Sequence, residues 1–191
     1  MPGVTWQEAL DRLKTGNLRF TGDTQRGLLR DGPRRAELAG GQQPFAIVLT
    51  CADSRVVPEL AFDAGLGELF VVRVAGNVPN PSSIASIEFA VANLGARLIV
   101  VMAHESCGAV AAAIEGGDAG KHLNHLLGFI QGAVASSEDK SVDAVARVNA
   151  RNSAAVLASE SDIVRGAVDG QGVRIVTAVY ALESGRVEFE D

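Results

Sequence analysis

The chain has 191 residues and a formal net charge of −6, and 47% of its residues are hydrophobic. This composition supports one buried core, so we expect a single domain over residues 1–191. An acidic chain is a poor partner for nucleic acids and anionic membranes, which select basic patches. No apolar run approaches the roughly 18 residues of a membrane span, and the first residues lack a secretory-signal pattern. We therefore expect a cytoplasmic protein that binds neither nucleic acid nor membrane.

Residues 1–43 predict a helical arm and a connection that precede the core. Thr5 and Glu8 have the spacing of a capping box for a helix over about 6–20. The apolar residues of that helix do not form one stripe, so we expect it to lie against a partner subunit. Residues 21–43 are rich in Arg, Gly and Asp and predict a solvated connection with a short helix near 34–38.

Residues 44–191 predict an α/β core in which strands alternate with helices. The expected strands are 45–50, 69–74, 98–102, 173–180 and 186–190, with a turn at 183–185 before the last. The expected helices are 58–64, 82–94, 108–115, 121–135 and 141–169, the last with a break near 159–161. The fold class is therefore α/β, with a mostly parallel central sheet of four strands, an antiparallel C-terminal edge strand and flanking helices.

Two short segments, CADSR at 51–55 and HESCG at 104–108, contain both cysteines of the chain and one of its three histidines. Each follows a predicted buried strand, and ligands gather at the carboxyl ends of parallel strands. Cys51, His104 and Cys107 offer the thiolate and imidazole donors that zinc prefers. The alternatives are two free buried cysteines beside a core histidine, or a disulfide, which a reducing compartment disfavours. The residues predict one Zn²⁺ per chain with its fourth position open.

A carboxylate and a guanidinium stand two residues apart in the first segment. An open zinc position is typical of catalytic sites, where a bound water is acidified to hydroxide. We expect Asp53 to accept the hydrogen bond of that hydroxide or, in a closed state, to take the fourth position itself. Arg55 is expected to pair with Asp53 and hold it off the metal. The alternative for this pair is a plain structural salt bridge.

The motifs C-x-D-S-R and H-x-x-C-G, in this order, resemble those of the β-class carbonic anhydrases. The resemblance continues through residues 65–77 (GLGELFVVRVAGN), 86–91 (SIEFAV) and 179–187 (VYALESGRV), and so covers nearly the whole chain. It implies reversible hydration of carbon dioxide to bicarbonate and a proton by attack of zinc-bound hydroxide. The alternatives are hydrolysis of carbonyl sulfide or carbon disulfide at the same site, and a non-catalytic zinc-binding relative.

The resemblance also implies a substrate pocket shared between subunits. Gln42 matches the family's substrate-orienting glutamine, and Phe70, Ala75 and Phe89 fall where the family lines its apolar pocket. Gly108 of the second motif completes the implied substrate-binding set. In this family the glutamine and the aromatic residues reach the metal from the partner subunit, so the resemblance implies a homodimer or a homotetramer.

Some members of the family carry a regulatory bicarbonate site that uses a tryptophan, an arginine and a tyrosine. The matching positions here are Val48, Arg73 and Tyr180. Because Val48 lacks the indole, we do not expect this regulatory site in the present chain.

Three further polar residues are expected to be structural. His122 and His125 lie three apart on a predicted helix and favour an exposed or capping role over a second metal site. Glu88 stands among apolar neighbours and predicts a buried, paired carboxylate.

Overall fold

A five-stranded sheet forms the centre of the computed structural model, which describes residues 4–190. The strands are β1 (Ala46–Thr50), β2 (Leu69–Arg73), β3 (Leu98–His104), β4 (Arg174–Tyr180) and β5 (Val187–Glu190). Their order in the sheet is β2-β1-β3-β4-β5. The first four strands are parallel, and β5 pairs antiparallel with β4, as the sequence predicts.

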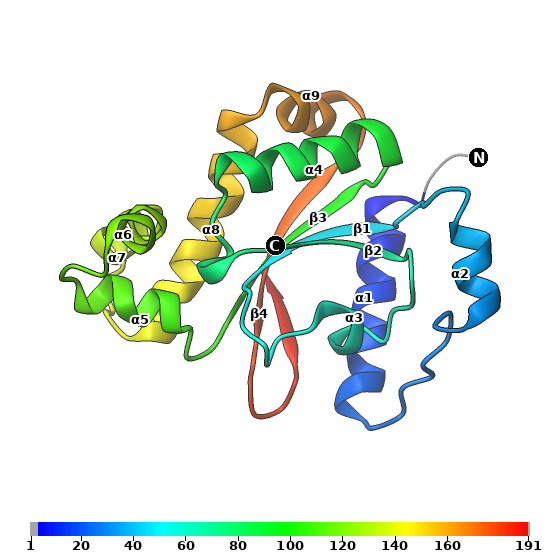
Figure 1. The fold of residues 1–191 in the computed structure, drawn as a ribbon, viewed down its shortest axis with the longest axis horizontal. Helices are drawn as coiled ribbons and strands as arrows, with labels where there is room; N and C mark the ends of the chain where they lie inside the picture. The colour runs from blue at the N-terminus through cyan, green and yellow to red at the C-terminus, as the bar shows by residue number, and fades with distance from the viewer. Residues whose placement is uncertain (1–3, 191) are drawn as a thin grey trace.

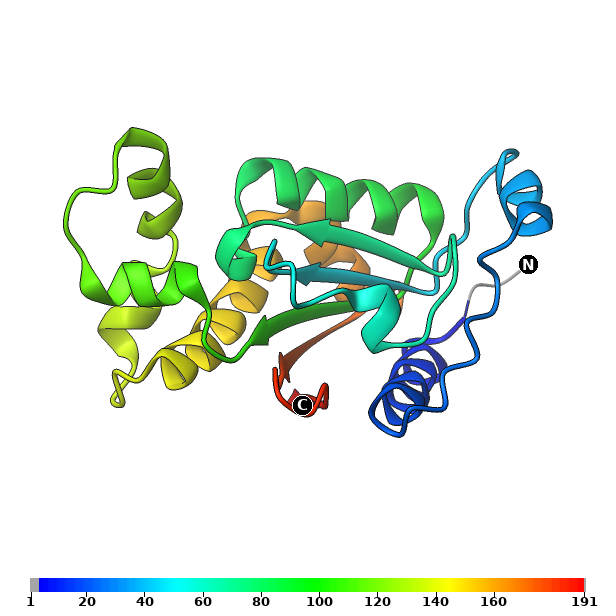
Figure 2. The ribbon, with the colours of Figure 1, turned by 60° about the horizontal axis from the view of Figure 1, so that its bottom comes forward.

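Helices cover both faces of this sheet (Figure 1). One face is covered mainly by α1 (Trp6–Thr21) and α3 (Pro58–Ala61), and the other mainly by α4 (Pro81–Leu94), α8 (Val142–Glu160) and α9 (Asp162–Gly170). The 3₁₀ turn η1 (Ala75–Asn77) and helices α5 (Gly108–Glu115), α6 (Lys121–Gly128) and α7 (Gln131–Ser136) continue this second face. In Figure 2 the α5–α7 segment extends away from the sheet, on the side opposite α2 (Gly32–Leu38).

The sequence of β1 explains why it is sandwiched between two layers. Ile47 and Leu49 pack into the cluster under α4 and α8, whereas Ala46 and Val48 pack into the cluster under α1. Successive side chains of a strand point to opposite faces, so a continuous apolar run requires cover on both. The strand is buried along its whole length, and the residue that follows it is therefore held rigidly.

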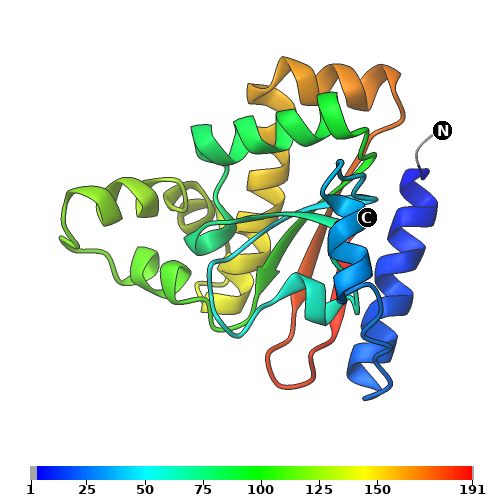
Figure 3. The ribbon, with the colours of Figure 1, turned by 45° about the vertical axis from the view of Figure 1, so that its right-hand side comes forward.

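One face of helix α1 packs on the sheet of its own chain, and the expectation that the helix also lies against a partner subunit stays a prediction. Thr5 and Glu8 form the predicted capping box. Helix α1 runs along one side of the sheet (Figure 3). Its residues Leu10 and Leu13 are buried, and Gly16 lets the helix approach closely, since a Cβ there would lie 1.9 Å from the carbonyl oxygen of Phe62. The small residues Ala9 and Gly16 extend the buried face of α1. The sequence pattern missed this face because it counted only the large apolar residues.

Several boundaries differ from the prediction. Strand β3 continues through His104, because Ala103 and His104 still pair with β4. The predicted helix over 121–135 is two helices, α6 and α7, and the helical part of 58–64 ends at Ala61. The break near 159–161 is confirmed at Ser161, whose hydroxyl accepts the N–H of Val164 and caps α9. Within residues 4–190, no helix has both the length and the hydropathy that crossing a bilayer requires.

Candidate metal centre

The three predicted ligands meet at the carboxyl ends of β1 and β3. Cys51 directly follows β1, His104 ends β3, and Cys107 is the N-cap residue of α5. Their side chains are 5%, 0% and 1% exposed, respectively. One ligand atom from each lies within 4.8 Å of the other two, and residues 4–190 contain no other such group of three His, Cys, Asp or Glu side chains. The structure thus brings together residues that are more than 50 positions apart in the sequence.

The imidazole of His104 is oriented by its own loop. Its Nδ1 lies 2.8 Å from the carbonyl oxygen of Glu105, a contact in which Nδ1–H donates. The proton is thereby held on Nδ1, and the lone pair is left on Nε2. Within the described part of the chain, Nε2 is one of two buried side-chain nitrogen or oxygen atoms without a hydrogen-bond partner. A buried, orphaned nitrogen beside two thiols fits a zinc ligand.

The two thiols lie close enough to share one proton, so that one is ionised while the other stays protonated. The hydrogen bond between them lowers the pKa of Cys51 and raises the pKa of Cys107, so one proton leaves readily and the second is retained. The backbone N–H of Gly76 also donates to Cys51 Sγ at 3.3 Å. A divalent cation favours both thiolates because it takes the place of the shared proton. The donor set therefore suits zinc.

Asp53 and Arg55 form a forked ion pair at the edge of this group. Arg55 Nε lies 2.9 Å from Asp53 Oδ1 and Nη2 lies 2.7 Å from Oδ2, while the Arg55 backbone N–H also donates to Oδ1. These bonds to Arg55 hold the pKa of the Asp53 carboxyl well below its usual range. Asp53 Oδ2 is 3.8 Å from His104 Nε2, so the carboxylate lies beside the ligand group.

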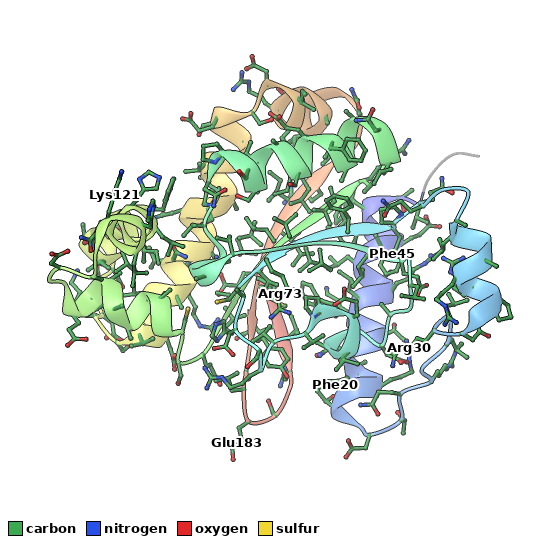
Figure 4. The ribbon with its side chains drawn as sticks, viewed as in Figure 1. Phe20, Arg30, Phe45, Arg73, Lys121 and Glu183 are labelled. Atoms are coloured by element: carbon green, nitrogen blue, oxygen red, sulfur yellow. The ribbon has the colours of Figure 1, made fainter. Side chains whose placement is uncertain are left out.

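Arg73, at the end of β2, fastens the CADSR segment (51–55) to the sheet. Its Nη2 donates to the carbonyl of Asp53 at 2.6 Å, and its Nε donates to the carbonyl of Cys51 at 3.1 Å. Figure 4 places Arg73 in the middle of the molecule, far from Lys121 on α6. Of the other two positions compared with the regulatory bicarbonate site, Val48 is fully buried and Tyr180 is nearly so.

The loops around the candidate ligands are braced by side chains whose roles sequence reasoning did not identify. Ser106 has a positive φ of 51°, and its N–H donates to Asp143 Oδ1 on α8 at 2.7 Å. Glu105 accepts the N–H of Leu182 at 3.0 Å. Asn149 on α8 donates to the carbonyl of Gly76 at 2.8 Å. Of these residues, only Asn149 could have been noticed in the sequence, because it is a polar residue among the apolar positions of its helix.

The structure does not bring all the residues implied for the substrate pocket together beside the candidate metal ligands. Ala75 precedes Gly76, whose N–H donates to Cys51, and Gly108 follows Cys107, so both lie beside candidate metal ligands. Phe70 is half-buried on β2, and Phe89 is 51% exposed on α4. Gln42 precedes β1 and therefore lies at the opposite end of that strand from Cys51.

The remaining polar residues behave as structural or surface groups. His122 and His125 are exposed on α6, and the ring of His125 packs edge-on against Phe129. Glu88 is half-buried and accepts a hydrogen bond from the Ser161 hydroxyl at 2.6 Å, which links α4 to the start of α9.

A buried thiolate–imidazole group at the strand ends of an α/β sheet is typical of a metalloenzyme centre. Residues 46–187 match the family model described as carbonic anhydrase. The chain is 35% identical to carbonic anhydrase 2 of Mycobacterium tuberculosis, an alignment that covers 100% of this chain and 96% of that protein. It is 36% identical to a carbonic anhydrase of Mycolicibacterium smegmatis, with 99% and 95% covered.

Solved structures agree with this match. A tetrameric β-carbonic anhydrase of Sordaria macrospora superposes with a TM-score of 0.75 at 24% identity, covering 92% of this chain and 93% of that one. A β-carbonic anhydrase of Aspergillus fumigatus gives a TM-score of 0.74 at 27% identity, with 97% and 90% covered. The chain belongs to the carbonic anhydrase family, in its β class. It is a lyase of the kind whose general reaction is the hydration of carbon dioxide.

Proposed function

We propose that the chain hydrates carbon dioxide reversibly at a Zn²⁺ ion held by Cys51, His104 and Cys107. The observation that carries the proposal is the buried meeting of these three donors, with the unpaired His104 Nε2 among them. When bound, zinc supplies the Lewis acidity that turns water into a nucleophile near neutral pH. Two thiolates offset the charge of the ion, so we expect activity to rise from neutral toward alkaline pH.

The chain's own residues orient that chemistry. The Asp53 carboxylate is ionised at neutral pH, so it can accept a hydrogen bond from the O–H group of the attacking nucleophile. That hydrogen bond would orient the lone pair of the nucleophile's oxygen. Arg55 grips both carboxylate oxygens and restrains Asp53 from reaching the ligand group itself. We propose Ala75 and Gly108 as the substrate-binding residues beside the metal, with Phe70 and Phe89 as apolar lining.

Gln42 favours a shared site. It stands at the far end of β1 from Cys51, in a loop that lines a cleft of about 640 Å³ together with Leu38 and Leu66. An orienting role at the metal is then open to it only in a second copy of the chain. We therefore propose a homodimer or a tetramer, the state named for the Sordaria macrospora relative. Thiolate ligands persist in a reducing compartment, which supports a cytoplasmic location.

Stopped-flow proton release on mixing the zinc-loaded chain with carbon dioxide tests the activity. We expect release well above the uncatalysed rate and in proportion to zinc content. Faster turnover of carbonyl sulfide or carbon disulfide would assign the site to their hydrolysis. No turnover of any of the three by a fully zinc-loaded chain would indicate a non-catalytic relative.

A further inference from the structure

Asn149 is a buried polar residue that the carbon dioxide chemistry does not use directly. It lies on α8 and is 1% exposed, next in sequence to the core residue Ala150. A buried amide without partners destabilises a core, so an asparagine at this position requires a specific hydrogen bond. Its Nδ2 donates to the carbonyl of Gly76 at 2.8 Å, across 73 positions of sequence.

Gly76 is held from both sides of its Cα. Its carbonyl accepts the bond from Asn149, and its N–H donates to Cys51 Sγ at 3.3 Å. The residue has φ 70° and ψ 17°, a left-handed conformation that favours glycine. A Cβ there would lie 2.7 Å from Ile130 Cδ1. The backbone of Gly76 thus links a side chain of α8 to a candidate metal ligand.

We propose that Asn149 is a positioning residue of the metal centre, acting through Gly76 on the Cys51 sulfur. The proposal rests on the zinc site proposed above. Loss of the amide would leave a buried carbonyl unpaired, and the Gly76 backbone would turn to find another partner. Its N–H would then move off the Cys51 sulfur and no longer stabilise the thiolate or fix its direction. Partners of this kind, one step removed from the metal, change metal affinity by about 10- to 100-fold.

Asn17 provides a matched control. It is also a buried asparagine, 5% exposed, and its Nδ2 donates to the carbonyls of Ala61 and Gly185 at 3.0 and 2.8 Å. It lies on α1, over the face of the sheet opposite to α8, and its bonds do not involve Gly76 or residues 51–55 and 104–108. Asn149→Ala and Asn17→Ala therefore remove the same chemical group, with and without a connection to Cys51.

The experiment measures zinc release from the wild-type chain and both variants into an excess of a chromogenic chelator. We expect Asn149→Ala to release zinc about 10- to 100-fold faster than wild type. Asn17→Ala should release it at the wild-type rate, even if its melting temperature falls. With Co²⁺ in place of zinc, the thiolate-to-cobalt absorption band should shift in Asn149→Ala alone.

Each other outcome overturns the proposal. Wild-type release and an unshifted band in Asn149→Ala would show that Asn149 does not act on the centre. Equal acceleration in both variants would show general destabilisation. If Asn149→Ala does not fold, Asn149→Leu is measured in its place, because leucine keeps the branched shape and lacks the donor. Loss of folding in both variants would show that the residue is purely structural. A wild-type chain that takes up no zinc would instead overturn the proposed function itself.

Discussion

Asp63 fastens the N-terminal arm to the core through a buried carboxylate. Its side chain is 1% exposed. It accepts hydrogen bonds from Arg19 Nε at 2.6 Å and from the backbone N–H groups of Arg26 and Gly27 at 2.9 and 3.0 Å. Burial raises the pKa of this carboxyl, but the three hydrogen bonds outweigh burial and lower the pKa to about 2. Replacing Asp63 with Asn should therefore destabilise the chain in a pH-dependent way.

The size of the effect follows from the shift. An aspartate in the unfolded chain titrates near pH 4, about two units higher, and each unit is worth about 1.4 kcal/mol. Ionised Asp63 then stabilises the fold by about 2.5 kcal/mol at neutral pH. Because the folded state has the lower pKa, this contribution is complete above about pH 5 and is lost as the pH falls from about 4 to about 2.

Urea unfolding of wild type and Asp63→Asn at one fixed protein concentration measures this difference. We expect a gap of about 2.5 kcal/mol near pH 7, about 5–10 °C in melting temperature, that narrows as the pH falls from about 4 toward about 2. Asp118→Asn is the control, since Asp118 also accepts a backbone N–H but lies on the surface. A gap that stays constant across this pH range would refute the reasoning.

Further predictions concern the metal centre and the assembly. Cys107→Ser should lose zinc and activity together, since a hydroxyl is a much poorer zinc ligand than a thiolate; full zinc content by elemental analysis would contradict the assignment. Arg55→Lys should keep zinc but lose most activity, because lysine cannot grip both oxygens of Asp53; an unimpaired rate would remove Arg55 from the mechanism. Gly76→Ala should melt earlier than wild type by calorimetry, given its left-handed φ and the contact with Ile130. Light scattering should show at least a dimer, and a fully active monomer would contradict a shared site.

Much of the fold could be predicted from the sequence because its signals are local. The apolar run of β1 and the turn before β5 determine the elements around them. The meeting of Cys51, His104 and Cys107 could be predicted because few residue types bind zinc and all three stand at or just after the carboxyl ends of strands, which meet at one edge of the sheet. These are properties of short segments, which need no knowledge of the rest of the chain.

The features that could not be predicted depend on distant contacts. Strand β3 reaches His104 because Ala103 pairs with Val179 of β4, and no local pattern contains that pairing. Asp143 braces Ser106 and Asn149 braces Gly76, both from a helix that begins more than 30 residues after Cys107. Their roles follow only once α8 is placed against β3 and η1.

The central claim is that two thiolates and one imidazole of this chain hold a single zinc ion. X-ray absorption at the zinc edge of the loaded wild-type chain tests it most directly. We predict two sulfur neighbours at about 2.3 Å and lighter nitrogen or oxygen neighbours at about 2.0–2.2 Å. A zinc ion surrounded only by nitrogen and oxygen, or a loaded chain with four sulfur neighbours, would contradict the account.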